Sequence, residues 1–313
     1  MLPVSDISIS TVHILCDAVK TSHISFDFLK WIRHLTAQRP NIKECRPITF
    51  VFHGINRDTQ FIVETLFSFL QHHIIKLEES EILSHDFINK HHITYVIDEA
   101  NLEKDVRIKL YDSIEVKSTI QSNNYSYYEV KRRVESYLNR EVPITFSFAN
   151  NDQAYVDFDF DKYQQSIREV VVEAAKSIAF AEDSFAYKII QAPLEKYTQA
   201  CNKGQFDLYP NCGLQHFSMT VDLDRNVYVC HNIHKRLAPS TISHINLVKA
   251  TEQIINSSFS NKPDCSLCEY LPMCNGGCPF FANQTRCKVM KIFFEEILKI
   301  GELIKSHRTE IEL

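Results

Sequence analysis

Cys265-Ser-Leu-Cys268-Glu-Tyr-Leu-Pro-Met-Cys274-Asn-Gly-Gly-Cys278-Pro places four thiols within fourteen residues of a chain of 313. Their spacing is Cys-x2-Cys-x5-Cys-x3-Cys, with a flexible Gly-Gly before the last thiol. Four thiols this close rarely occur by chance in a cytosolic chain. Thiolates at such spacings hold iron–sulfur clusters, so this stretch predicts a metal centre around which the last third of the chain folds.

Three more cysteines can bring ligands to this region from other directions. Cys212 and Cys230 bracket two short strand patterns with a turn at 223–226, and such a hairpin would bring both thiols to the same end. Cys287 follows nine residues after Cys278 and precedes an amphipathic stretch at 289–304, so it can fold back on the compact run.

All seven cysteines match the SPASM pattern, so the region resembles the C-terminal twitch/SPASM region of radical S-adenosylmethionine (SAM) enzymes that modify peptides and proteins. That pattern is Cys, 9 to 15 residues, Gly, four residues, Cys, then Cys-x2-Cys-x5-Cys-x3-Cys, then a final Cys. One position departs from it, because Arg225 stands where the turn glycine belongs. A turn residue can change without moving the thiols.

The resemblance implies two auxiliary 4Fe-4S clusters with separate ligand sets. The first set is Cys212, Cys230 and Cys278, and the second is Cys265, Cys268, Cys274 and Cys287. The first set is one ligand short, because Ser218 stands where some members of the family have a fourth cysteine. The nearby alternatives for that position are His216, His231 and Cys201.

Zinc is the alternative occupant of these thiols, because Cys-x2-Cys pairs also build tetrahedral zinc sites. Zinc sites usually repeat the x2 pair, whereas x5 followed by x3 with a remote seventh cysteine suits cubane clusters. Disulfides are disfavoured, because the N-terminus has no basic region followed by an apolar core that would export the chain.

The N-terminal two thirds lacks the motif that holds the SAM-cleaving cluster in the family. That motif is Cys-x3-Cys-x2-Cys in the loop after the first strand, but the first 200 residues contain only Cys16 and Cys45. We interpret Cys16 as a buried strand residue that behaves as a small hydrophobe. The second SAM-binding element of the family, Gly-Gly-Glu-Pro, is reduced here to Gly54, followed by Ile55, Asn56 and Arg57.

The order of hydrophobic patterns predicts an α/β fold, because β-branched runs alternate with segments of helical period. The expected strands cover residues 10–16, 48–53, 74–77, 93–97, 115–120 and 143–148. The expected helices cover residues 26–37, 59–72, 81–90, 102–111, 127–138, 160–179, 187–200 and 289–304. By resemblance, residues 1–204 form a degenerate partial (β/α)6 radical SAM-like barrel, and residues 205–313 form a SPASM iron–sulfur domain with a C-terminal helix.

Charge and hydropathy exclude several partner classes. The net charge is −5, with no run of five basic residues and no stretch of eighteen apolar residues. The sequence therefore predicts a soluble, cytoplasmic protein that binds neither nucleic acid nor membranes. Two acidic groups, Asp98-Glu99 and the alternating Asp157, Asp159 and Asp161, are candidates for proton removal, although capping or solvated roles are the simpler interpretation.

The sequence as a whole resembles pseudo radical SAM proteins found beside active maturases in systems that modify ribosomally made peptides. The resemblance implies a non-SAM-cleaving iron–sulfur partner that relays electrons, holds a precursor peptide or forms a complex with an active radical SAM maturase. It implies no catalytic residue and no bound SAM. Two alternatives stay open: a peptide-modifying enzyme that uses an open auxiliary cluster site or an unrecognised radical SAM activity, and a zinc-stapled binding protein.

Overall fold

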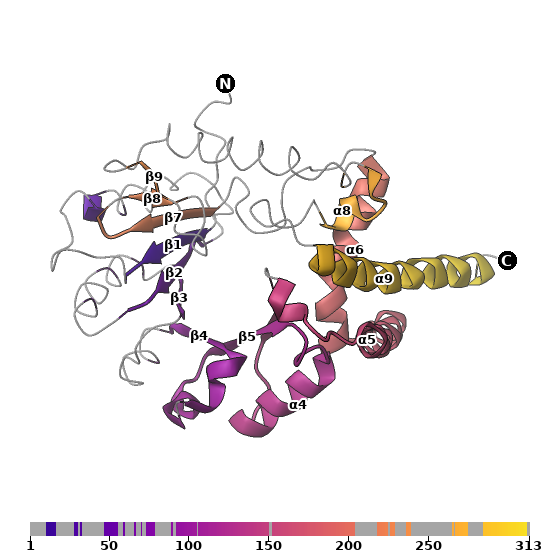
Figure 1. Ribbon diagram of the computed structural model, residues 1–313, viewed down its shortest axis with the longest axis horizontal. Coiled ribbons are helices and arrows are strands. Elements are labelled where there is room, and N and C mark those ends of the chain that lie inside the picture. Colours follow the sequence, from indigo (N-terminus) through magenta and orange to yellow (C-terminus); the bar gives the residue numbers. More distant parts are fainter. Residues whose placement is uncertain are drawn as a thin grey trace. The chain divides into compact units, whose positions relative to one another are not determined.

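The computed structural model of the chain describes several separate ranges of residues, and the account below is confined to them. They are residues 11–16, 28–30, 32, 47–55, 59, 66, 70, 73–78, 89, 92–104, 106–149, 152–203, 218–224, 226–228, 236–238, 265, 267–274 and 284–311. In these ranges the chain forms an α/β fold (Figure 1). None of the helices so described combines the length and apolar character needed to span a bilayer.

The strands join into one sheet in the order β6-β5-β4-β3-β2-β1-β7-β8-β9. Their bounds are β1 Thr11–Leu15, β2 Thr49–His53, β3 Ile74–Glu78, β4 Thr94–Asp98, β5 Ile114–Ile120, β6 Ile144–Phe148, β7 Ser218–Asp222, β8 Val227–Tyr228 and β9 Arg236–Ala238. The pairings from β5 through β1 to β7 are parallel, and β7-β8 and β8-β9 are antiparallel. The six expected strands are confirmed within about two residues, as ordinary boundary uncertainty allows.

The hairpin expected around residues 223–226 is also present, but its first strand has a second partner that the sequence did not indicate. β7 pairs in parallel with β1, with Thr11 opposite Ser218 and Leu15 opposite Asp222. Buried Asp222 organises the turn, because its carboxylate accepts hydrogen bonds from the Asn226 backbone and side-chain nitrogens at 2.8 and 2.7 Å and from the Tyr228 hydroxyl at 2.8 Å. These three hydrogen bonds hold the two sides of the turn together.

The described helices follow the expected positions, with clear capping signals at several ends. Their bounds are α4 Tyr127–Leu138, α5 Phe160–Phe180, α6 Phe185–Lys203, α8 Leu271–Cys274 and α9 Gln284–Ile311, with 3-10 segments η2 Glu99–Lys104, η3 Val106–Leu110 and η4 Asp152–Tyr155. Ser126 caps the start of α4, and Asn139 ends it in the left-handed region at φ 59°. The helix expected over 102–111 is instead split between η2 and η3. The helices expected over 26–37, 59–72 and 81–90 fall mostly outside the described residues and stay predictions.

The chain divides into two compact units, and the division falls within β5. Unit 1 is residues 1–117, 141–143 and 213–254, and unit 2 is residues 118–140, 144–212 and 255–313. The predicted boundary between residues 204 and 205 lies outside the described residues and stays a prediction.

In unit 1 the two faces of the parallel sheet differ in character, because side chains alternate along each strand. One face is apolar and fully buried, and includes Val12, Ile14, Phe50, Phe52 and Leu77. The other face is polar and includes His13, His53, Lys76, Glu78, Glu115 and Lys117. Parallel sheets are usually apolar on both faces, so the polar face needs its charges paired.

The charges on this face are paired across β4, between β3 and β5. Lys76 on β3 forms an ion pair with Glu115 on β5, and Glu78 on β3 forms another with Lys117 on β5. β4 lies between these strands, and in register it presents Thr94 and Val96, which are short enough to be bridged. Val96 is only 2% exposed although it lies on the polar face.

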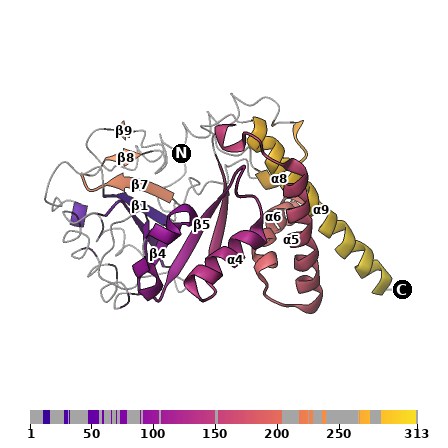
Figure 2. The ribbon, with the colours of Figure 1, turned by 60° about the horizontal axis from the view of Figure 1, so that its bottom comes forward.

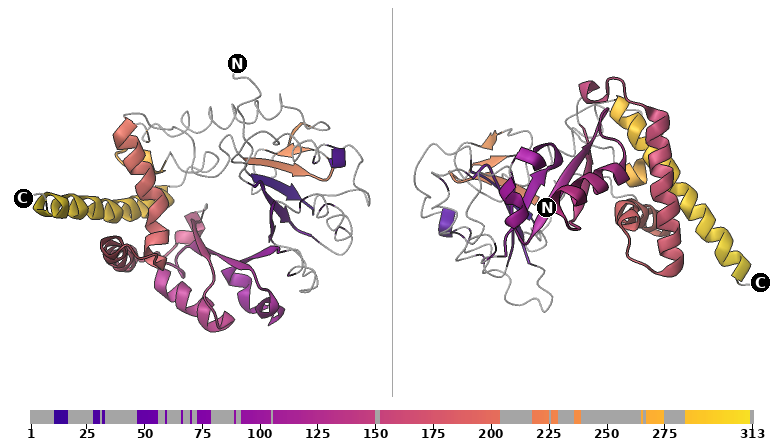
Figure 3. Two further views of the ribbon diagram at one scale, coloured as in Figure 1. Left: turned by 180° about the vertical axis from the view of Figure 1, so that it is seen from behind. Right: turned by 90° about the horizontal axis from the view of Figure 1, so that it is seen from below.

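Unit 2 is built around α5, α6 and α9, which lie side by side in Figure 2 and in both views of Figure 3. α9 buries one stripe, formed by Val289, Phe293, Ile297 and Ile300, against a core rich in aromatic rings. Apolar residues three and four positions apart form one face of a helix, so this spacing fixes which side of α9 faces the core.

One buried carboxylate interrupts that apolar stripe. Glu296 is 2% exposed, and its Oε1 accepts from Gln164 Nε2 at 2.6 Å, Arg168 Nε at 3.2 Å and Lys299 Nζ at 2.8 Å. Burial raises the pKa of this carboxyl. The hydrogen bonds from Lys299 and Gln164 and the charges of Lys299 and Arg168 outweigh burial, so the pKa lies below its ordinary value. Glu296 thus ties α9 to α5 through ionised contacts.

Replacing Glu296 with Ala should lower the free energy of unfolding of unit 2 by about 1 to 3 kcal/mol at neutral pH, because the α9–α5 contact loses a buried carboxylate that accepts three hydrogen bonds. Because the folded pKa is depressed, the carboxylate stabilises the fold above its unfolded pKa of about 4.3. That stability is lost as the pH falls through the folded pKa. Urea unfolding of wild type and variant, followed by circular dichroism across that pH range, should show the difference shrinking towards acid.

Glu295→Ala is the matched control, because the neighbouring Glu295 is half exposed and its ion pair with Lys299, at 3.6 Å, lies at the surface. Its loss should cost less than about 1 kcal/mol. Equal costs for the two variants would contradict a special role for the buried carboxylate.

Candidate functional site

The four thiols of the second predicted ligand set are all among the described residues, and we call Cys265, Cys268, Cys274 and Cys287 the thiol quartet. A run of tight turns positions the first three. The Cys268 backbone N–H donates to the Cys265 carbonyl at 3.2 Å, Leu271 donates to Cys268 at 3.0 Å, and Cys274 donates to Tyr270 at 2.9 Å. α8 begins at Leu271 with Pro272 in its first turn, where a missing N–H costs nothing.

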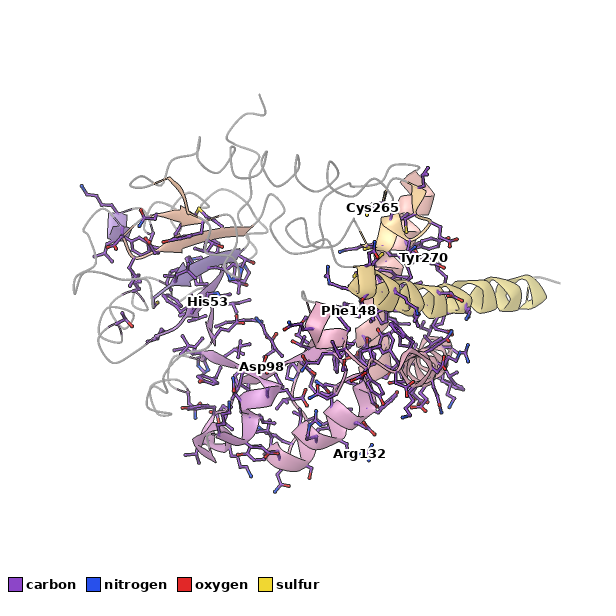
Figure 4. The ribbon with its side chains drawn as sticks, in the orientation of Figure 1. His53, Asp98, Arg132, Phe148, Cys265 and Tyr270 are labelled. Carbon is purple, nitrogen blue, oxygen red and sulfur yellow. The ribbon has the colours of Figure 1, made fainter. Side chains whose placement is uncertain are left out.

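Cys287 reaches the quartet from the first turn of α9. Its thiol is exposed, whereas the other three lie at intermediate depth. Met273 is buried, and Cys274 and Tyr270 pack against the aromatic core of unit 2. Figure 4 shows Cys265 and Tyr270 beside α8 and the beginning of α9. The core therefore supports one side of the quartet, and solvent reaches the other side.

The pKa of Cys274 depends on the other three thiols of the quartet. Burial is the largest cause that raises the pKa of its thiol, to about 11. The positive charge of Arg286 lowers this pKa, and the thiols of Cys287, Cys265 and Cys268 raise it. A proton therefore stays on Cys274 near neutral pH, and a metal must displace it to gain a thiolate ligand.

The donor set suits an iron–sulfur cluster chemically, because four cysteine thiolates are the standard ligands of a 4Fe-4S cubane. Within the described ranges, no three His, Cys, Asp or Glu side chains converge closely enough to hold a single metal ion.

The structure does not describe the first predicted ligand set. Cys212, Cys230 and Cys278 lie outside the described residues, as do the alternative ligands His216 and His231. Cys201 lies in α6 and Ser218 begins β7, but their side chains are outside the description. The first cluster therefore stays a prediction from the sequence.

At the carboxyl end of β1, Cys16 is 1% exposed, as expected for a strand residue acting as a small hydrophobe. Its Sγ lies 3.8 Å from the Ile14 carbonyl, and its backbone N–H donates to the His53 carbonyl at 2.8 Å. Gly54 follows β2 at a φ of 67° and donates to the Glu78 carbonyl at 3.1 Å. A residue without Cβ adopts this φ without strain.

Two of the acidic candidates, Asp98 and Asp159, have capping roles. Asp98 Oδ1 accepts from the Ala100 backbone N–H at 2.8 Å and so starts η2. Asp159 caps α5, accepting from the Lys162 backbone N–H at 3.0 Å, and pairs with Lys162 Nζ at 3.1 Å. The hydrogen bond from the Lys162 backbone is the largest cause that lowers the pKa of Asp159. Asp157 adopts φ 60° in the turn before the helix.

Sequence reasoning missed a histidine pair on the polar face of unit 1. His13 Nδ1 and His53 Nε2 are 2.9 Å apart, and His53 Nδ1 lies 3.6 Å from Glu78 Oε2. The ring centroids of His13 and His53 are 5.1 Å apart at an interplanar angle of 27°, which suits two rings meeting edge to edge through one shared proton. The signal was the alternation of polar residues along β1 to β3, which repeats every second residue.

No family model matches the chain, and no curated protein matches it. A solved structure does match: polyhistidine-tagged anSMEcpe with bound AdoMet, with a TM-score of 0.62 and 13% sequence identity over 94% of this chain and 98% of that chain. That protein is an anaerobic sulfatase-maturating radical SAM enzyme. The likeness is one of fold, and on this ground the chain has a radical SAM-like α/β fold.

Proposed function

We propose that this chain is an iron–sulfur partner protein of a radical SAM peptide maturation system, and that it does not itself cleave SAM. The observation that carries the proposal is the thiol quartet in unit 2, in which the tight turns of residues 265–274 and the first turn of α9 bring Cys265, Cys268 and Cys287 close enough to Cys274 to raise the pKa of its thiol. In a chain with a radical SAM-like fold, such a quartet is the natural place for an auxiliary cluster.

Two auxiliary 4Fe-4S clusters are part of the proposal. The quartet would hold the second, and Cys212, Cys230 and Cys278 would hold the first. Such clusters supply one-electron transfer, with a potential set by charge, hydrogen bonds and exposure. The chain's own contribution is to present thiols on rigid elements, to shield Cys274 and to keep Cys287 near solvent. In the cytoplasm the protein would relay electrons to an active maturase, hold its precursor peptide or form a complex with it.

The absence of SAM cleavage rests on the residues after β1 and β2. The only thiol at the end of β1 is buried Cys16, and the first 200 residues contain one further cysteine. After β2, Ile55 stands where the family motif has a glycine, and it is 1% exposed. Close backbone approach to a ligand generally uses glycine, so a buried isoleucine there argues against the family's mode of SAM binding.

Metal analysis of anaerobically purified protein is the first test. We expect about eight iron and about eight acid-labile sulfide per chain, as two cubane clusters require. About twelve iron would indicate a SAM-type cluster in unit 1 and overturn the proposal. Zinc with negligible iron and sulfide would leave a zinc-stapled binding protein.

Replacing Cys274 with Ala should remove about half of the iron, because one cluster of two loses a ligand. It should also destabilise unit 2, because binding of a structural metal contributes to folding. Cys16→Ala is the matched control, and should leave the iron content unchanged because Cys16 is no ligand. Loss of iron from Cys16→Ala would show that this strand cysteine holds a cluster.

SAM binding is a separate test. Isothermal titration calorimetry at about millimolar SAM should detect no binding, a free energy weaker than about −4 kcal/mol. No 5′-deoxyadenosine should form after reduction with dithionite. Detection of the nucleoside in wild type, and its loss in Cys16→Ala, would establish an active radical SAM enzyme.

A further inference from the structure

Two histidines and a glutamate form a row across the polar face of unit 1, and we call Glu78, His53 and His13 the imidazole row. His53 Nδ1 lies 3.6 Å from Glu78 Oε2, and His53 Nε2 lies 2.9 Å from His13 Nδ1. Glu78 and His53 are the last residues of β3 and β2, and Figure 4 labels His53. The row therefore crosses three neighbouring strands near their carboxyl ends, where open parallel sheets commonly bind ligands.

The row is shielded from solvent in its middle and reaches solvent at one end. His53 is 7% exposed, whereas His13 is partly exposed. Glu78 is also held from its other side, because its Oε1 pairs with Lys117. Electrostatic contacts are stronger in a shielded place than at an open surface, so the carboxylate has a marked effect on the two imidazoles.

The carboxylate decides where the protons of the row lie. An ionised carboxylate only accepts hydrogen bonds, so the His53 nitrogen that faces Glu78, Nδ1, carries a proton. A neutral imidazole has one N–H, which leaves a lone pair on His53 Nε2 and makes His13 Nδ1 the donor across the 2.9 Å contact. By the same rule His13 Nε2 carries a lone pair. His13 is thus the basic end of the row.

A buried hydroxyl lies beside that basic end. Thr220 is opposite His13 in the parallel pairing of β7 with β1, so the two side chains share one face of the sheet. Thr220 is 1% exposed, and its Oγ1 has no hydrogen-bond partner in the part of the chain that the structure describes. Buried polar groups are nearly always hydrogen-bonded, so an unpartnered hydroxyl here marks a place for a bound molecule.

We propose that the imidazole row is a general acid–base site that takes a small neutral ligand with an O–H or N–H group. His13 exchanges a proton with the ligand, and the Thr220 hydroxyl holds the ligand in place. A neutral ligand fits because the two ion pairs across β4 leave little net charge on this face. The inference goes beyond the proposed function, because it concerns unit 1 and requires no iron.

In the acid–base step the ligand's proton passes to His13 Nε2, and the ligand keeps the electron pair of the broken bond. The Nδ1 proton of His13 then passes to His53 Nε2, so the positive charge comes to lie on His53. That charge is 3.6 Å from the Glu78 carboxylate, a positioning residue that stays ionised and stabilises the imidazolium. The reverse transfers return the proton, so the row acts as base and acid in turn.

Nitrogen NMR of protein with isotope-labelled histidine tests the proton order. We expect both His13 and His53 to carry their proton on Nδ1 at about pH 8, where neutral imidazole predominates. In Glu78→Gln the amide N–H can donate to His53 Nδ1, so both tautomers should reverse. A proton on Nε2 of His13 in the wild type would overturn the proposal.

Glu115→Gln is the matched control, because it removes the same charge from the other ion pair on this face. Both histidines should keep their proton on Nδ1 in this variant. Reversal of the tautomers in Glu115→Gln as well would show that loss of charge anywhere on the face has this effect, and would remove the special role of Glu78.

Acylation by diethyl pyrocarbonate, followed residue by residue with mass spectrometry, tests the basic end. This reagent acylates the unprotonated nitrogen of an imidazole, so we expect it to modify His13 at Nε2. Glu78→Gln should slow that reaction about tenfold or more, because the reversed tautomer has no lone pair on Nε2. Exposed His92 is the internal reference, and its rate should not change. Equal rates for His13 in wild type and Glu78→Gln would contradict its role as the base.

Replacement of Thr220 with Val tests the place for the ligand. Without a bound molecule the hydroxyl has no partner, so its removal should raise the urea midpoint of unfolding. Thr94→Val is the control, because the Thr94 hydroxyl lies 2.9 Å from Ser113 Oγ, and its loss should lower the midpoint. A lower midpoint for Thr220→Val would show that this hydroxyl already has a structural partner, and would overturn the ligand site.

Discussion

The crossing ion pairs over β4 are the constraint on which unit 1 depends. Neighbouring strands are about 4.8 Å apart, so charges on β3 and β5 must bridge about 10 Å. Lysine and glutamate are long enough to meet over β4, although the partners in each pair are two residues out of register. Lys76 and Glu115 meet between Thr94 and Val96, and Glu78 and Lys117 meet between Val96 and Asp98. A sheet with unpaired charges on this face would pay a desolvation cost with nothing to offset it.

Much of this architecture is local in origin and could be predicted from the sequence. β-branched runs indicated the six expected strands, and α4 and α5 begin at the side-chain caps Ser126 and Asp159. The pairing of β7 with β1 could not be predicted, because it joins residues about two hundred positions apart and both strands have the same alternating pattern. The sequence also did not predict that the helix expected over 102–111 is split. The Ala100 backbone N–H donates to the Asp98 carboxylate, and a 3-10 turn begins there instead.

In the candidate site, too, some features could be predicted from the sequence and others could not. The resemblance to the SPASM pattern implied which thiols form one ligand set, and in the structure consecutive backbone turns join three of them, Cys265, Cys268 and Cys274. The different exposures of Cys274 and Cys287 depend on how α8 and α9 pack against the aromatic core, which spacing does not encode. The His13–His53 contact and the ion pairs over β4 likewise depend on strand order. In the sequence, Glu296 is one of several acids in an amphipathic helix. Its role in joining α9 to α5 depends on Gln164 and Arg168, which the sequence alone does not place beside it.

The high pKa of the Cys274 thiol has a consequence for the protein before any metal arrives. The thiolate is the form that attacks disulfides and alkylating agents, so a protonated and shielded Cys274 reacts slowly with both. Cys287 is exposed to both kinds of reagent in solution. Within the quartet, Cys274 is therefore protected from premature crosslinking before a metal binds, and Cys287 is the thiol most exposed to oxidants.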